Sequence, residues 1–88
     1  MLPNDPDVSD TLGWVYYKRD LATLAIGHLR DSVEKVPSNP VYHYHLGRAY
    51  LKTGEKERGR ASLERALRLD PSFDGAAHAR QALASAGR

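Results

Sequence analysis

The stretch that decides the fold is the five-residue sequence Leu46-Gly47-Arg48-Ala49-Tyr50, because its skeleton occurs twice at a fixed spacing. Thirty-four residues upstream the chain reads Leu12-Gly13-Trp14-Val15-Tyr16, with the same Leu-Gly-x-x-Tyr pattern. The prolines follow the same step, as Pro3, Pro37 and Pro71 and again as Pro6 and Pro40. A period of this length is typical of stacked supersecondary units. The sequence therefore predicts a repeat protein.

Length and composition limit what those units can form. The chain has 88 residues, enough for one small domain with a marginal core, and it has no cysteine for a disulfide or a cysteine zinc site. Its 13 Lys and Arg against 11 Asp and Glu give a net charge of +2, too weak to indicate nucleic-acid binding.

Neither a membrane span nor a signal peptide is indicated by the sequence. No apolar run approaches the roughly 18 residues of a membrane span, so we expect no membrane insertion. The first residues lack the basic and apolar regions of a signal peptide. A cytoplasmic location is the default expectation, unless the chain is a piece of a longer protein.

The first unit is predicted to be a helical hairpin. A helix is expected from Asp7 to about Lys18, followed by a tight turn in which Asp20 takes a left-handed conformation. A second helix is expected from Leu21 to Lys35, ending before Pro37. The first helix has one apolar stripe, formed by Val8, Leu12, Val15 and Tyr16.

The second unit repeats this pattern. Ser38 and Asn39 supply a cap, and Pro40 begins a third helix that continues to about Thr53. Gly54 suits the end of that helix, and a fourth is expected at 56–69. The inward positions predicted for the two helices are Tyr42, Leu46, Ala49 and Tyr50, then Gly59, Leu63, Ala66 and Leu67.

The two ends of the chain differ from the repeats. The alanine-rich stretch from Phe73 to about Ala86 favours a helix that covers the preceding pair and exposes a polar back, as a terminal cap must. The start, Leu2-Pro3-Asn4-Asp5-Pro6, parallels Val36-Pro37-Ser38-Asn39-Pro40. We therefore expect the chain to begin on the last turn of a preceding unit, either because it was cut from a longer array or because that turn is a remnant of one.

With these features the chain resembles the tetratricopeptide repeat (TPR) family, whose pattern is W-x2-L-G-x2-Y, A-x3-F and P. The family's Trp is replaced by Ser9 and His43, and its second aromatic by Leu29 and Leu63. The two copies read Ser9-x2-Leu12-Gly13-x2-Tyr16, Ala25-x3-Leu29, Pro37 and His43-x2-Leu46-Gly47-x2-Tyr50, Gly59-x3-Leu63, Pro71.

The resemblance implies an all-α, right-handed helical-hairpin solenoid of about five helices. A single domain would span 1–88, with repeat 1 at about 6–39, repeat 2 at about 40–73 and a capping helix at about 74–86. A related hairpin solenoid or a plain antiparallel bundle is the alternative, although a bundle has no reason to keep a constant 34-residue step.

The resemblance also implies that a peptide or partner helix binds in a concave groove, which the first helix of each pair lines. Aromatic and Arg side chains there suit an interface. Ordinary helix surface or packing between repeats is the alternative, and Trp14 in particular either contacts a partner or packs beside Tyr44. The predicted binding residues are Asp10, Trp14, Tyr17, Lys18, Tyr44, Arg48, Leu51 and Lys52.

A subgroup of the family captures a C-terminal carboxylate with Lys, Asn and Arg. Of the equivalent positions here only Arg48 fits, so this specialised binding is disfavoured. Arg48 and Lys52, one helical turn apart, can still pair with an acidic residue of a partner.

Metal and catalytic sites are not expected. His43 and His45 are two residues apart and project from different faces of a helix, whereas zinc-binding pairs on helices are four apart. No nucleophile motif, phosphate loop or pair of carboxylates is present. The basic residues of 56–69 alternate with Glu, which favours a solvated face. No cofactor or nucleic-acid partner is therefore predicted.

The expected function is a non-enzymatic module for protein–protein interaction. The alternative is a structural unit that self-associates into a homo-oligomer, or the excised end of a longer array. At least three repeats are usually needed for a stable array. Upstream repeats or another copy of the chain would cover the outer side of the first helix.

Overall fold

The computed structural model describes residues 5–86, which form five helices and no strand. The helices are α1 (Pro6–Lys18), α2 (Ala22–Lys35), α3 (Pro40–Lys52), α4 (Lys56–Leu69) and α5 (Ala76–Ala86). The all-α prediction is confirmed, and the first four helices lie within one or two residues of their predicted bounds.

The first helix of each hairpin begins in the same way. The side chain of Asp5 accepts a hydrogen bond from the backbone N–H of Asp7, and that of Asn39 accepts one from the N–H of Val41. A proline occupies the first turn after each cap, where its missing N–H would have no partner in any case. The 34-residue repeat of sequence is thus a repeat of local structure.

The two hairpin turns are also equivalent. Asp20 has a φ of 62° and Gly54 a φ of 86°, as predicted for these turns. In the first turn the N–H of Leu21 donates to the carbonyl of Tyr16, and in the second the N–H of Glu55 donates to the carbonyl of Tyr50, both at 2.9 Å.

Each hairpin closes tightly over a glycine. A Cβ atom on Gly13 would lie 2.6 Å from Cγ of Leu29, and one on Gly47 would lie 2.8 Å from Cγ of Leu63 and 3.0 Å from the carbonyl oxygen of Gly59. The close approach of antiparallel helices that the Leu-Gly pattern predicts is therefore present in both units.

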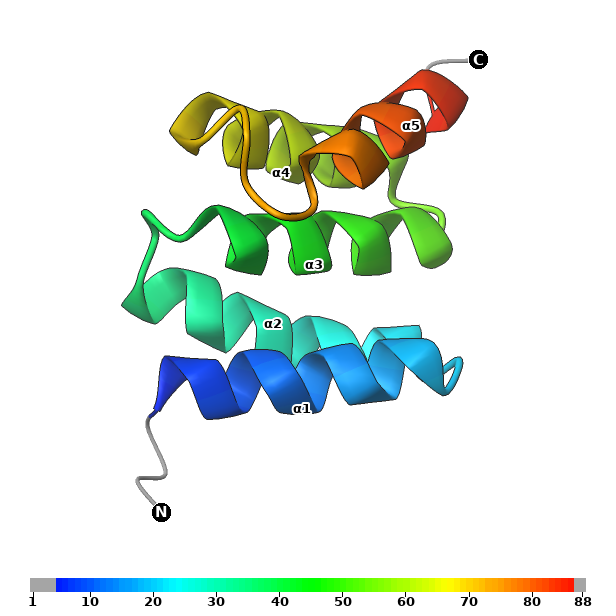
Figure 1. Cartoon of the computed structure of the whole chain (residues 1–88). Coiled ribbons are helices and arrows are strands. Elements are labelled where there is room, and N and C mark those ends of the chain that lie inside the picture. Colours follow the sequence, from blue (N-terminus) through cyan, green and yellow to red (C-terminus); the bar gives the residue numbers. More distant parts are fainter. Residues whose placement is uncertain (1–4, 87–88) are drawn as a thin grey trace.

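The hairpins stack into a helical-hairpin solenoid (Figure 1), as predicted. Within the described residues, α1 packs against α2 and α3 against α4, while α2 contacts α3 and α5 contacts α4. The helices α1, α3 and α5 also contact one another in sequence, so they form one layer, with α2 and α4 behind it. None of the described helices has the length and apolarity needed to cross a bilayer.

The core lies between the hairpins. Ala25 and Leu29 of α2 pack against Leu46, Ala49 and Tyr50 of α3, and all five are buried. A second cluster is formed by α3, α4, α5 and the loop before α5, and its buried members are Tyr44, Leu63, Ala66, Phe73, Ala76 and Ala79.

The apolar stripe of α1 lies on the outer side of this helix, where a cover from upstream repeats or from another copy of the chain was expected. Val8, Leu12 and Val15 are exposed, although they are the 34-residue equivalents of the buried Tyr42, Leu46 and Ala49. Leu12 is 39% exposed and Leu46 only 6%. The reason is that α2 covers the stripe of α3, whereas no described helix lies on the outer side of α1 (Figure 1).

The last helix starts later than predicted, at Ala76 rather than Phe73. Phe73 is instead a buried residue of the preceding loop, with its ring edge-on to Tyr44 at 5.7 Å between centroids. Burying this large aromatic offsets the loss of helical hydrogen bonds in three residues. As predicted, α5 packs through alanines, with Ala76 and Ala79 buried.

Candidate functional site

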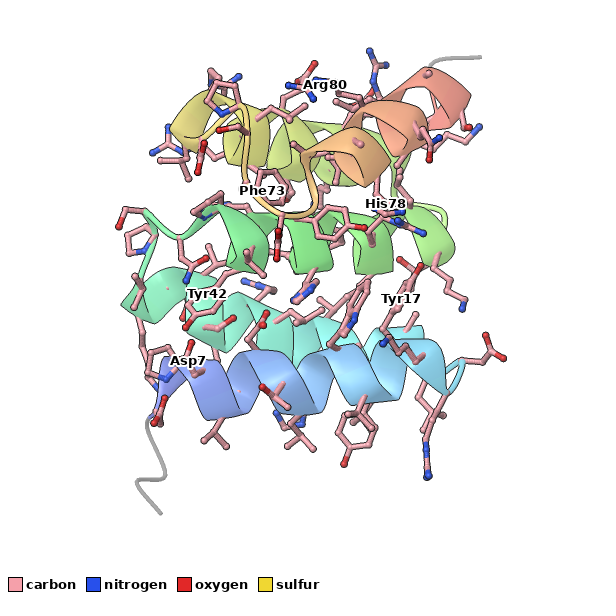
Figure 2. The ribbon with its side chains drawn as sticks, in the orientation of Figure 1. Asp7, Tyr17, Tyr42, Phe73, His78 and Arg80 are labelled. Atoms are coloured by element: carbon pink, nitrogen blue, oxygen red, sulfur yellow. The ribbon has the colours of Figure 1, made fainter. Side chains whose placement is uncertain are left out.

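A cavity of about 530 Å³ opens between α1, α3, α5 and the start of α4, and we call it the groove cavity. In Figure 2, Tyr17 of α1 and His78 of α5 lie on the same side of the molecule, on either side of α3. The residues that line the groove cavity are Tyr17, Arg48, Leu51, Lys52, Lys56, His78, Gln81, Ala82, Ser85 and Ala86.

One side of the groove cavity continues into a stack of aromatic rings. The ring of Trp14 stacks on that of His45, with centroids 4.0 Å apart, and on that of Tyr17, with centroids 4.5 Å apart. The planes of the Trp14 and Tyr17 rings are almost parallel. The Trp14 centroid is also 6.1 Å from that of Tyr44. Of the two alternatives for Trp14, packing against the third helix is therefore present, and the ring stays half-buried. The stack holds Tyr17 in place beside the cavity.

Arg48 is oriented by two tyrosines. Its Nη1 donates a hydrogen bond of 2.9 Å to the hydroxyl of Tyr44, and its Cζ lies 5.8 Å from that ring and 6.0 Å from the ring of Tyr17. These distances are within the range of cation–π attraction. Within residues 5–86 no carboxylate forms an ion pair with Arg48. Four of its five N–H donors thus remain for other partners.

Lys52 lies one turn further along α3. Its Nζ is 4.7 Å from the ring centroid of Tyr17 and 2.7 Å from Oδ1 of Asp20, whose side chain is 82% exposed. The hydrogen bond from Lys52 lowers the pKa of Asp20, and the same bond raises the pKa of Lys52, so both groups stay charged near neutral pH. An exposed pair of this kind is weak and easily exchanged.

Two of the predicted groove residues, Asp10 and Tyr44, are buried and do not line the groove cavity. Asp10 forms a pair with His45, whose Nδ1 lies 2.8 and 2.9 Å from the two carboxylate oxygens. Tyr44 packs in the core against Phe73. The contact between α1 and α3 places Asp10 opposite His45 of the next repeat. The carboxylate of Asp10 therefore forms a contact between the two repeats. Asp10 and Tyr44 support the site from beneath.

The other predicted groove residues lie at or beside the cavity. Tyr17, Arg48, Leu51 and Lys52 line it. Trp14 backs Tyr17, and Nζ of the exposed Lys18 lies 5.7 Å from the Trp14 ring centroid. These four lining residues form the α1 and α3 sides of the groove cavity.

The α5 side was not predicted. The sequence suggested only a cap with a polar back, yet His78, Gln81 and Ser85 line the groove cavity together with Lys56 from α4. A signal was present: these three α5 residues are separated by three and four positions and therefore share a helical face.

A second polar contact joins the repeats at the other end of α1 and α3 (Figure 2). The hydroxyl of Tyr42 donates to the carboxylate of Asp7, and burial together with this bond raises the pKa of Tyr42. Tyr42 stays protonated throughout the physiological range. Its role is to hold α1 against α3 at the end remote from Tyr17.

The histidines have separate partners. Nε2 of His43 lies 2.7 Å from the carbonyl oxygen of Pro37, while His45 pairs with Asp10. Across residues 5–86 no group of three or more His, Cys, Asp or Glu side chains is placed to hold a metal ion.

The fold and site together define a class, the helical-repeat proteins with a groove on the layer formed by the first helix of each pair. Within that class, residues 40–73 match the family model described as tetratricopeptide repeat, and these residues are α3, α4 and the following turn. The match thus places a tetratricopeptide repeat at the second hairpin, and the five-helix architecture of the described residues is consistent with that fold. No curated protein matches the sequence. TPR repeats are in general non-enzymatic scaffolds for protein–protein interaction.

Proposed function

We propose that this protein binds a peptide segment of a partner in the groove cavity. The observation that carries the proposal is Arg48, which two tyrosines hold beside the cavity and which has no carboxylate partner among the described residues. Arg and Tyr are among the residue types that dominate binding energy at interfaces. The proposed module has no catalytic role.

The groove cavity offers both parts of a peptide site. Leu51, Ala82 and Ala86 supply apolar wall, and Gln81 and Ser85 supply hydrogen-bonding groups at its edge. Because Tyr17 is stacked on Trp14, one wall is ordered before binding, and the partner bears most of the entropic cost of association. We expect the backbone to move little when a peptide binds.

Trp14 is the chain's single Trp, and its stacking on Tyr17 makes its fluorescence a direct reporter of the site. We expect peptides selected from a random display library to change this fluorescence, and to shift amide NMR signals of Tyr17, Leu51 and Ser85. The double variant Tyr17→Ala with Arg48→Ala should weaken these peptides roughly tenfold or more, since it removes two central contacts.

The matched control is Arg65→Ala with Arg68→Ala, two exposed residues of α4 that do not line the cavity. It should bind peptides as the wild type does, and circular dichroism should show equal helicity in all three proteins. Peptide binding that survives in the double variant, or shifts that gather on α4 instead, would refute the groove proposal.

Self-association is the second candidate function, and the exposed stripe of α1 favours it. All exposed large hydrophobics of the described residues lie in the first hairpin, and Val8, Leu12 and Val15 share one face of α1. The equivalent face of α3 is covered by an apolar helix. In a symmetric dimer, the stripe of one copy would pack against the same stripe of the other copy, with α1 against α1.

We expect the average mass from sedimentation equilibrium to rise with protein concentration toward that of a dimer. Val15→Glu should abolish the rise, because it places a charge in the contact, whereas Ala61→Glu on the exposed side of α4 should leave it unchanged. A wild-type chain that remains monomeric at every concentration would exclude this function.

A further inference from the structure

We infer that the segment bound in the groove cavity is acidic, with a carboxylate-bearing side chain on Arg48 and a second on Lys52 or Lys56. This inference rests on the groove function proposed above and adds the chemistry of the partner. It concerns an internal acidic stretch, and it requires no free C-terminus.

The charge of the cavity is the first reason. Its lining includes three cationic side chains, those of Arg48, Lys52 and Lys56, and no Asp or Glu. The whole chain has a net charge of only +2. The lining of the cavity is therefore one-sidedly cationic in a chain that is nearly balanced, which favours anionic groups there.

The geometry of Arg48 is the second reason. Its guanidinium keeps four N–H donors after bonding to Tyr44, and a planar guanidinium binds a carboxylate through two parallel hydrogen bonds. The hydrogen bond to Tyr44 and the nearby rings of Tyr44 and Tyr17 restrict its rotation, so less side-chain entropy is lost on binding than for a free Arg. Lys52 follows four residues later, at a distance of about 5–6 Å between Cβ atoms.

Asp20 is the third reason, because it already places a carboxylate on one of these cations. Its Oδ1 lies 2.7 Å from Nζ of Lys52, and it comes from the exposed turn after α1. Since the pair is open to solvent, a carboxylate of a partner can replace that of Asp20 at little cost. Asp20 therefore acts as an internal competitor for the acidic partner.

A peptide fits these features better than a nucleic acid does. The cations lie beside the apolar wall of Leu51, Ala82 and Ala86, which would pack against aliphatic or aromatic neighbours of the acidic residues. A nucleic-acid site would instead need a long basic stripe along the backbone path. On the exposed part of α4 the basic residues are interspersed with Glu, and Arg58 forms an ion pair with Glu55.

The first test is the composition of peptides recovered from the display library on the full chain. We expect them to be enriched in Asp and Glu, next to Leu or an aromatic residue. On the variant Arg48→Gln with Lys52→Gln, recovery should continue but the acidic enrichment should disappear. Neutral or basic peptides that bind the wild type at Tyr17 and Leu51 would overturn the acidic inference while the groove function stood. A failure to recover any peptide would overturn both.

The second test changes affinity in both directions with one labelled peptide of alternating Glu and Leu, measured by fluorescence anisotropy. Arg48→Gln with Lys52→Gln should weaken binding about fivefold to tenfold. Asp20→Asn should strengthen it about twofold to fourfold, because it frees Lys52, and Asn tolerates the left-handed backbone of this turn.

Arg65→Gln with Arg68→Gln is the matched control and should change nothing. The peptide with Gln in place of Glu should bind the wild type and Asp20→Asn equally. If Asp20→Asn does not strengthen binding of the Glu peptide, or if single-stranded DNA competes as well as that peptide does, the inferred acidic-peptide site is wrong.

Discussion

Leu46→Ala is expected to lower the free energy of unfolding by about 2–5 kcal/mol, whereas Leu12→Ala should lower it by less than about 1 kcal/mol. The two leucines occupy the same position of the repeat, 34 residues apart. Leu46 is buried between α2 and α3, and its loss leaves a cavity. Leu12 is exposed on α1 and its loss leaves none. Urea unfolding followed by circular dichroism measures both changes.

The same experiment tests whether a second copy of the chain covers the apolar stripe of α1. It should be run at low and at high protein concentration, because a second copy on α1 would bury Leu12. The cost of Leu12→Ala should then grow with concentration, while that of Leu46→Ala should stay constant. Equal costs for the two leucines at low concentration would contradict the structure, since they would require a buried α1 stripe within a single chain.

Gly47→Ala is the second substitution with a large expected effect, a loss of about 1–3 kcal/mol. The new Cβ would lie 2.8 Å from Cγ of Leu63 and 3.0 Å from the carbonyl oxygen of Gly59. The leucine can move in part, but the carbonyl belongs to the backbone of α4, so α3 and α4 must separate slightly. Thermal unfolding followed by the fluorescence of Trp14 measures the loss.

Gly27→Ala is the control and should have the opposite sign. Gly27 lies inside α2, and a Cβ there would have no atom within 4 Å. Alanine has the higher helix propensity, so this variant should be more stable by about 0.5–1 kcal/mol. Stabilisation of both variants would refute the close approach of α3 and α4. Destabilisation of both would refute the exposed position of Gly27.

Local chemistry explains why so much of the fold was predictable. The capping side chain of Asn39, the proline after it and the left-handed turns at Asp20 and Gly54 depend on neighbours in sequence, and all have the predicted conformation. The positions of the small residues were predictable for the same reason. A glycine that recurs at a constant spacing, such as Gly47, indicates where two helices touch.

The sequence is least informative where a residue's surroundings come from distant parts of the chain. The periodicity that identified the stripe of α1 says which side chains share a face, but it cannot say whether another helix covers that face. In the same way Asp10 has the position of a groove residue in its own repeat, and only the approach of α3 buries it against His45. Phe73 belongs to a helix-favouring stretch, yet burial against Tyr44 holds it in a loop.

The groove cavity contains both kinds of feature, those that the sequence predicts and those that depend on tertiary packing. From the repeat pattern alone, Tyr17, Arg48, Leu51 and Lys52 were assigned to the concave side of α1 and α3, because helix periodicity fixes which face each residue occupies. The wall contributed by α5 and the orientation of Arg48 between two tyrosines depend on tertiary packing. Backbone preferences and periodicity act over a few residues and are written in the sequence, whereas burial and charge pairing are set by side chains that meet only when the hairpins stack.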